Sequence, residues 1–262
     1  MITEKQIVAV LRGETVEHDG LRLAWRVVHP DLRSTHDYRW PLPGQWAESD
    51  PGDCAYTEGN PCPQFWGDGL CLARTWRGAA SGNIPAITGL ICGYREEDVL
   101  GRDEYKLRVK RTYVFEIIDI SALIRAGHMA GADMRNADLS GTNLREANLT
   151  GSNLTCANLT GANLRDADLR CANLLAADIL HAILKGANLQ DANLVNADLQ
   201  DATLQRANLQ DATLQDADLE GANLEGANLQ DATLRNANLE GARLTDVNLN
   251  GADLYGVRGL EC

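Results

Sequence analysis

The chain has 262 residues, of which 44% are hydrophobic, and it carries a formal net charge of −13 at pH 7. This length and apolar content allow one or two domains with a buried core. The acidic balance argues against direct binding to nucleic acid or to an anionic membrane, because the long-range field repels phosphate.

The first residues contain no apolar run of the length that a signal peptide or a membrane span needs, so we expect a cytoplasmic protein. The seven cysteines are an odd number and show no C-x-x-C spacing. This usage favours scattered reduced thiols over a disulfide framework or a zinc site. We therefore expect neither a metal nor another cofactor.

Residues 1–122 are predicted to form a small β-rich domain, with an α+β fold as the alternative. All five tryptophans lie here, before residue 77, so the two halves of the chain differ in packing chemistry. Alternation predicts strands at 21–28 and 106–118, with turns at 41–44, 49–52 and 67–69 between them. Trp40, Trp46, Trp66 and Trp76 could line a binding cleft, but in a small domain such residues are more often core.

Three cations alternate along the second predicted strand, at Lys106, Arg108 and Lys110. Alternation places them on one face, where they form a candidate anion-binding row for nucleic acid or a phosphate ligand. The other interpretation is a solvated edge that discourages aggregation. The histidines and cysteines of this domain match no zinc ribbon, catalytic triad or phosphate loop, so we predict no enzyme.

A repeat begins after this domain. From Met129 to Leu254 every fifth residue is Met, Leu or Ile, 26 times in succession. The residue two before is usually Ala, and the one just before is usually Asn or Asp. A period of five fits neither a helix nor a flat strand. It predicts a coil of short straight sides in which Leu and Ala point inward, while Gly, Asp or Asn two after the Leu makes the corner.

This pattern resembles the pentapeptide repeat family, whose unit A-(D/N)-L-x-x the chain repeats over about half its length. The resemblance implies an all-β fold: a right-handed quadrilateral β-helix over residues 123–256, with four units per coil and about 6.5 coils. At about 4.8 Å per coil the rod would be about 31 Å long. Residues 257–262 would follow as a short tail.

The negative charge is concentrated in this solenoid, since residues 127–262 hold 19 acidic and 9 basic side chains. Units 20 residues apart share a side, so acids gather on two opposite sides. Aspartates that directly precede Leu could instead serve the turns, which would leave Asp201, Glu220 and Glu240 as free charges. The candidate partner-binding acids are Asp178, Asp198, Asp201, Asp218, Glu220 and Glu240 on one side and Asp191, Asp211 and Asp231 on the other.

The resemblance implies a non-enzymatic protein that binds another protein, as a DNA mimic against DNA gyrase, topoisomerase IV or another DNA-binding protein. A duplex of about 31 Å carries roughly 18 charges, so this solenoid would be a dilute mimic. Members that bind gyrase resemble dimers joined through C-terminal helices, which this chain lacks, and this departure weakens the gyrase interpretation. The last coil needs a cap or a partner, so either the final residues fold over it or that end meets another molecule, which allows a homodimer through the C-terminal end. The alternative is an interaction or scaffold module in which the N-terminal domain recognises a partner or ligand and the solenoid is a spacer or assembly surface.

Overall fold

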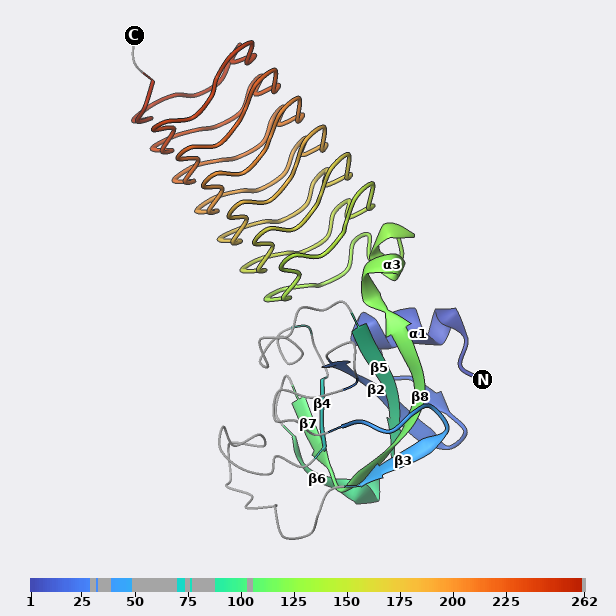
Figure 1. The fold of residues 1–262 in the computed structure, drawn as a ribbon. Coiled ribbons are helices and arrows are strands. Elements are labelled where there is room, and N and C mark those ends of the chain that lie inside the picture. Colours follow the sequence, from blue (N-terminus) through green and yellow to red (C-terminus); the bar gives the residue numbers. More distant parts are fainter. Residues whose placement is uncertain are drawn as a thin grey trace. The chain divides into compact units, whose positions relative to one another are not determined.

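The computed structural model describes residues 1–28, 32, 39–48, 70–73, 76, 88–102 and 106–260. The chain divides into two compact units, residues Met1–Ile120 and Ser121–Cys262. Figure 1 labels the helices and strands of the first unit and draws the second as a stack of coils.

The first unit begins with helix α1, Glu4–Leu11. The Thr3 hydroxyl accepts a hydrogen bond from the Gln6 backbone N–H at 3.3 Å, and the Gln6 side chain accepts one from the Thr3 N–H at 3.1 Å. This capping box satisfies two backbone donors at the helix start. Sequence analysis did not predict this helix, although the Thr-x-x-Gln signature precedes its buried Ile7.

The helix is followed by an eight-stranded sheet in which every described pair is antiparallel. Its order is β3-β8-β5-β2-β4-β7-β6, with β1 paired to β2. A 3-10 turn, η1, spans Glu96–Asp98. The strands are β1 Glu17–His18, β2 Leu21–Val28, β3 Gln45–Glu48, β4 Leu70–Ala73, β5 Thr88–Tyr94, β6 Val99–Arg102, β7 Lys106–Val109 and β8 Arg111–Asp119.

The predicted strand at 21–28 is confirmed as β2, but the single strand predicted at 106–118 is wrong. The chain bends at Lys110, whose N–H donates to the Asp98 carbonyl at 2.8 Å. Strand β7 before the bend pairs with β4 and β6, whereas β8 after it pairs with β3 and β5. The predicted turn at 41–44 is present, with Gly44 at φ +89°, and the predicted turns at 49–52 and 67–69 lie outside the described residues.

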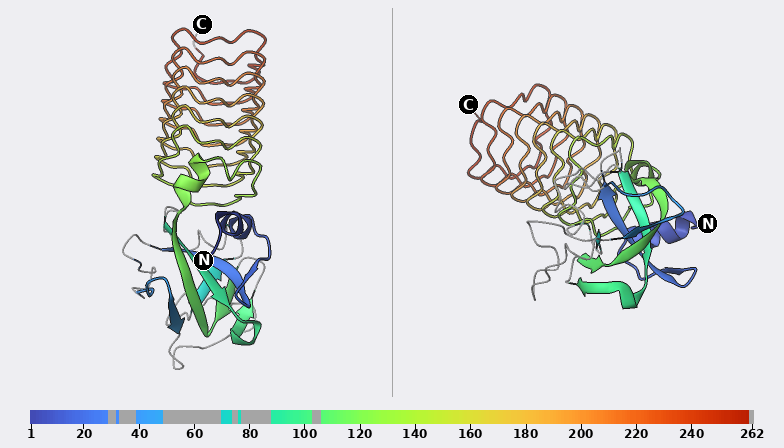
Figure 2. Two further views of the ribbon diagram at one scale, coloured as in Figure 1. Left: turned by 90° about the vertical axis from the view of Figure 1, so that its right-hand side faces the viewer. Right: turned by 60° about the horizontal axis from the view of Figure 1, so that its bottom comes forward.

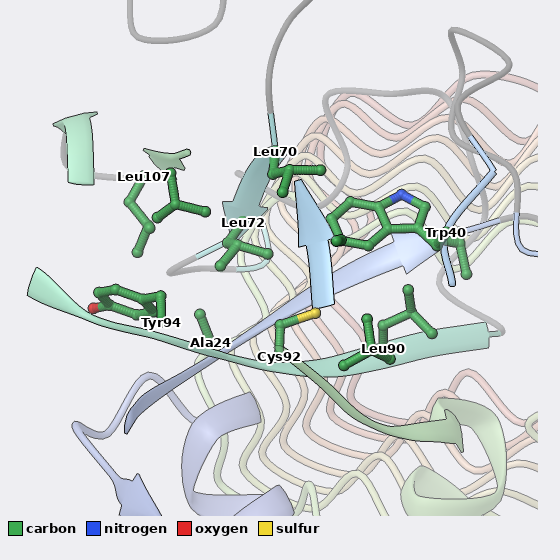
Figure 3. Packing of buried hydrophobic residues seen from close by; sticks show 12 residues of the cluster. Ala24, Trp40, Leu70, Leu72, Leu90, Cys92, Tyr94 and Leu107 are labelled. Carbon is green, nitrogen blue, oxygen red and sulfur yellow. The ribbon is translucent and has the colours of Figure 1, made fainter. Parts of the chain in front are cut away.

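One face of the sheet carries the core of the first unit (Figure 3). The pairs Ala24–Cys92 and Leu72–Leu107 lie opposite each other on neighbouring strands, so their side chains share that face. Trp40 joins this cluster. Trp25 and Trp76 are buried as well, and their rings meet edge to face at 4.9 Å between centroids. These three tryptophans are therefore core residues; Trp46 is partly exposed, and Trp66 lies outside the described residues.

The second unit is the predicted solenoid, a right-handed quadrilateral β-helix (Figure 2). Helix α3, Ile120–Arg125, leads into it, and the Arg125 guanidinium donates to the Asn143 carbonyl at 2.8 Å. Residues 20 apart pair in parallel, as Asp198 does with Asp218. In each step an inward Leu N–H donates to the next coil, for example from Leu199 to the Asp218 carbonyl at 2.7 Å. The backbone of successive coils is thus continuously hydrogen-bonded.

The interior is filled as predicted, because the Leu and Ala of each unit are almost fully buried from Met129 to Leu239. Two units replace Ala by a hydroxyl residue, and both hydroxyls are satisfied. Thr142 donates to the Leu139 carbonyl at 2.6 Å, and Ser152 donates to the Leu149 carbonyl at 2.7 Å. A local acceptor three residues back therefore allows a polar atom inside the coil.

The corners confirm the prediction of turn residues. The residue two after each inward side chain has a positive φ in every unit, between 52° at Ala176 and 73° at Gly256. Gly, Asn and Asp tolerate this left-handed conformation best. Six corners instead hold less suited residues, namely Glu146, Cys156, Cys171, Ala176, His181 and Arg206.

Candidate protein-binding surface

The aspartates that directly precede an inward residue serve the turns. Asp178, Asp198 and Asp218 each accept a hydrogen bond from the backbone N–H two residues later, at 3.2, 3.0 and 3.1 Å. Asp218 also accepts from Gln200 Nε2 at 2.7 Å and from Asn238 Nδ2 at 3.0 Å. These contacts give the three carboxylates a local structural role, so they form the supporting part of the candidate surface.

A second group of acids on the same side projects into solvent. Asp201, Glu220 and Glu240 are exposed and lie at one corner of successive coils; together they are called the first acidic edge. A Cβ on Gly221 would lie 2.4 Å from Asp201 Oδ1, so the glycine leaves room for this carboxylate. His181 Nδ1 lies 3.8 Å from Asp201 Oδ2 and is charged only when protonated.

The opposite corner carries Asp191, Asp211 and Asp231, called the second acidic edge. All three are exposed, and each repeats after one coil, a spacing of about 4.8 Å. Gln210 Nε2 donates to Asp211 at 3.1 Å, and Gln230 Nε2 donates to Asp231 at the same distance. These donors are neutral, so the negative charge of the edge is retained.

The earlier coils differ because four of the six acids between residues 127 and 190 are paired with arginines. The Arg170 guanidinium, 2.6 Å from the Asp168 carboxylate, lowers the pKa of Asp168 through its hydrogen bond. Within residues 121–260, no Lys or Arg forms an ion pair with either acidic edge. The unneutralised charge is therefore concentrated between residues 191 and 240. The paired acids of the earlier coils are Asp133 with Arg135, Glu146 with Arg145, Asp166 with Arg165 and Asp168 with Arg170.

The three cations of the N-terminal unit do not form an exposed row. Arg108 is fully buried, Lys106 is half-buried and Lys110 is exposed in the bend after β7. Among the described residues, none forms a hydrogen bond with the three guanidinium nitrogens of Arg108 or an ion pair with its side chain. The alternation of residues along a strand predicts which face of the sheet carries Arg108, but it does not predict whether that face is exposed or covered by other parts of the chain.

The described part of the chain contains no group of three or more His, Cys, Asp or Glu side chains that could hold a metal ion. No helix among these residues is long and apolar enough to cross a membrane.

Comparison with known proteins bears on the coils just described. The sequence model of the pentapeptide repeats matches residues 132–170, 157–186, 182–221 and 222–258, with eight copies. The solved structure of HetL, a pentapeptide repeat protein involved in heterocyst differentiation regulation in the cyanobacterium Nostoc sp. strain PCC 7120, is 31% identical over 50% of this chain and 76% of its own, with a TM-score of 0.24. The chain belongs to the pentapeptide repeat family. Proteins of this family are generally structural or interaction modules without enzymatic activity.

Two further solved structures are similar to part of the chain. Another protein from Nostoc PCC 7120 is 35% identical over 38% of this chain and 83% of its own, with a TM-score of 0.32. QnrB1, a plasmid-mediated fluoroquinolone resistance protein, is 21% identical over 50% of this chain and 84% of its own, with a TM-score of 0.28. No curated protein matches the chain significantly.

Proposed function

We propose that this pentapeptide repeat protein binds a basic, DNA-binding surface of a protein partner through its acidic edges, as a DNA mimic. A type II topoisomerase, DNA gyrase or topoisomerase IV, is the partner class to test first, and the proposed location is the cytoplasm. The observation that carries the proposal is the contrast along the solenoid: most acids of the early coils are paired with arginine, whereas no Lys or Arg within residues 121–260 pairs with either acidic edge between residues 191 and 240.

The spacing of these charges supports the proposal. Asp191, Asp211 and Asp231 repeat about every 4.8 Å, whereas one DNA strand carries a phosphate about every 3.4 Å. A basic groove that accepts duplex DNA could therefore meet one edge charge per coil. The lower charge density predicts weaker binding than DNA itself, and the ionic nature of the contact predicts that the affinity falls as the salt concentration rises.

The last coil supports a homodimer as a further part of the proposal. Leu244, Leu249 and Leu254 are partly exposed, in contrast to the fully buried Leu of the preceding coils. Tyr255 beside them is 77% exposed. Light scattering on the full chain tests this: a Tyr255→Asp variant is expected to shift the mass from that of a dimer to that of a monomer, and a wild-type monomer would contradict it.

Supercoiling by purified gyrase, with and without a quinolone, is the experiment that tests the proposal. Wild-type protein is expected to inhibit supercoiling or to relieve quinolone inhibition. In a first variant the first acidic edge is neutralised by Asp201→Asn, Glu220→Gln and Glu240→Gln. Exposed charge pairs contribute about 0.2–1 kcal/mol each, so this variant should weaken the effect by about 3-fold to 100-fold.

A second variant neutralises the opposite edge by Asp191→Asn, Asp211→Asn and Asp231→Asn. Asparagine tolerates the positive φ of these corners, so the coil keeps its backbone while it loses three charges. The matched control is Glu146→Gln, Asp166→Asn and Asp168→Asn, which removes three charges from acids that arginine already neutralises. No effect of micromolar wild-type protein on gyrase or topoisomerase IV would refute the topoisomerase assignment, and equal losses in all three variants would refute binding through the edges.

A further inference from the structure

A cavity of about 350 Å³ opens in the N-terminal unit where the sheet meets the segment that follows α1. Its apolar floor is one end of the core cluster: Ala24, Tyr94 and Leu107 line it, and Figure 3 places these three together at that end. The cavity thus lies at the mouth of a curved sheet, a common position for small-molecule sites in β-barrels.

The sheet is strongly curved. Strands β7 and β8 are four steps apart in the sheet order, which is about 19 Å in a flat sheet, yet only Lys110 separates them along the chain. On β2 and β6, Arg22 and Arg102 both bind Glu96, the former with Nη1 2.8 Å from Oε2, and both arginines line the cavity.

The segment after α1 completes the wall. It folds back because Gly13 takes φ +83° and the Glu14 N–H donates to the Ala9 carbonyl at 3.0 Å. This places Arg12 and Glu14 in the lining, so the cavity has three guanidiniums and one carboxylate. Two of these guanidiniums already have anionic partners beside the cavity, because Arg22 pairs with Glu17 and Glu96 and Arg102 pairs with Glu96.

The lining separates into two chemical parts. Arg22 and Arg102 each use one terminal nitrogen on Glu96, and an arginine has five N–H donors in a planar fork. Both arginines donate to the same carboxylate, and arginine binds oxyanions well. The rest of the lining is mainly apolar and includes Val10, Ala24 and Leu107.

We propose that this cavity binds a small organic oxyanion, a carboxylate or phosphate monoester with a compact apolar body. The head group is held by Arg12, Arg22 and Arg102, and the body lies against the apolar end of the core cluster. The volume is at the lower end of the roughly 300–1,000 Å³ of typical ligand pockets, so the ligand is small. Glu14 supplies an acceptor for an N–H or O–H of the same molecule.

Titration of the full chain tests this inference, with calorimetry and tryptophan fluorescence as readouts because Trp25 lines the cavity. The probes are benzoate and phenyl phosphate, with acetate and inorganic phosphate as head groups without a body, and benzamide as a body without charge. Saturable binding of benzoate or phenyl phosphate is expected, with the matching head group at least about tenfold weaker and benzamide inactive. Preference between the two aromatic probes distinguishes carboxylate from phosphate as the head group.

Variants assign the binding to this cavity. Arg102→Gln is expected to weaken binding about tenfold to a hundredfold, since hydrogen bonds to charged groups are the strong ones. Arg12→Gln is a second variant on an exposed side chain, which keeps the test open if Arg102→Gln does not fold. The control is Arg95→Gln, which removes the same charge from a residue that pairs with Glu97 outside the lining.

Three results would overturn the inference. They are no saturable binding of either aromatic probe up to about 10 mM, equal affinity for an aromatic probe and its bare head group, and equal weakening by Arg95→Gln and the two cavity variants. None of them depends on whether the acidic edges bind a topoisomerase.

Discussion

Replacing Leu204 by alanine is expected to destabilise the solenoid by about 2–5 kcal/mol, the usual range when truncation of a buried leucine leaves a cavity in the core. Leu204 is 0% exposed, and so are Leu184 and Leu224, the inward residues of the coils on either side. Its side chain is therefore enclosed along the axis as well as by its own coil. Little of the cavity can be refilled, because the stacked backbones on both sides are hydrogen-bonded to each other.

Urea unfolding with two probes measures this change. All tryptophans lie in the first 76 residues, so tryptophan fluorescence follows the N-terminal unit, while far-ultraviolet circular dichroism also follows the solenoid. The control is Leu249→Ala, since Leu249 in the last coil is already partly exposed and should lose about half as much or less. A loss below about 1 kcal/mol at Leu204, or equal losses at both sites, would refute the stacked, solvent-free interior.

Three other predictions concern single residues. Ala176→Gly should stabilise the solenoid by about 1 kcal/mol and so raise its melting temperature, because Ala176 holds a positive φ of 52° and glycine adopts this conformation without the steric cost that alanine meets. A lower melting temperature would contradict the left-handed corner. Arg108→Met should stabilise the N-terminal unit by about 1–4 kcal/mol in urea unfolding, because it removes a buried charge without a partner among the described residues; a loss of stability would contradict this. Burial raises the pKa of the Cys92 thiol from 9.0 to about 12. Between these two pH values the thiol ionises in the unfolded chain but stays protonated in the folded one, so the free energy of unfolding should fall as pH rises through that window. Urea midpoints of wild type and Cys92→Ala across that window test the last prediction, and parallel curves would contradict it.

The solenoid could be predicted in detail because its information is local and repeated. The inward Leu and Ala, the corner residues and the stacking of units 20 apart all follow from one five-residue pattern. Even the turn-forming role of Asp178 could be anticipated, since an aspartate before a turn often accepts a nearby backbone N–H. What the pattern leaves open is pairing: it does not show that Arg170 neutralises Asp168 while Asp201 remains without such a cation.

The N-terminal unit was harder to predict because its structure depends on distant contacts. Alternation runs unbroken through Lys110, yet strands on either side of this residue join different parts of the sheet. The cavity depends on Arg22 and Arg102, which are 80 positions apart in sequence and meet only through Glu96. No local signal marks either residue as a neighbour of the other.

The 20-residue step of the solenoid has a consequence for how such a chain can change in evolution. Duplication of a whole coil lengthens an acidic edge by one step and leaves every later carboxylate at its own corner. Duplication of a single five-residue unit keeps the interior equally well filled, but it rotates everything downstream by a quarter turn, so that acids after the insertion pass to neighbouring corners. Fold and surface therefore tolerate different insertions: the coil accepts any multiple of five residues, whereas a partner that reads an edge accepts only multiples of twenty.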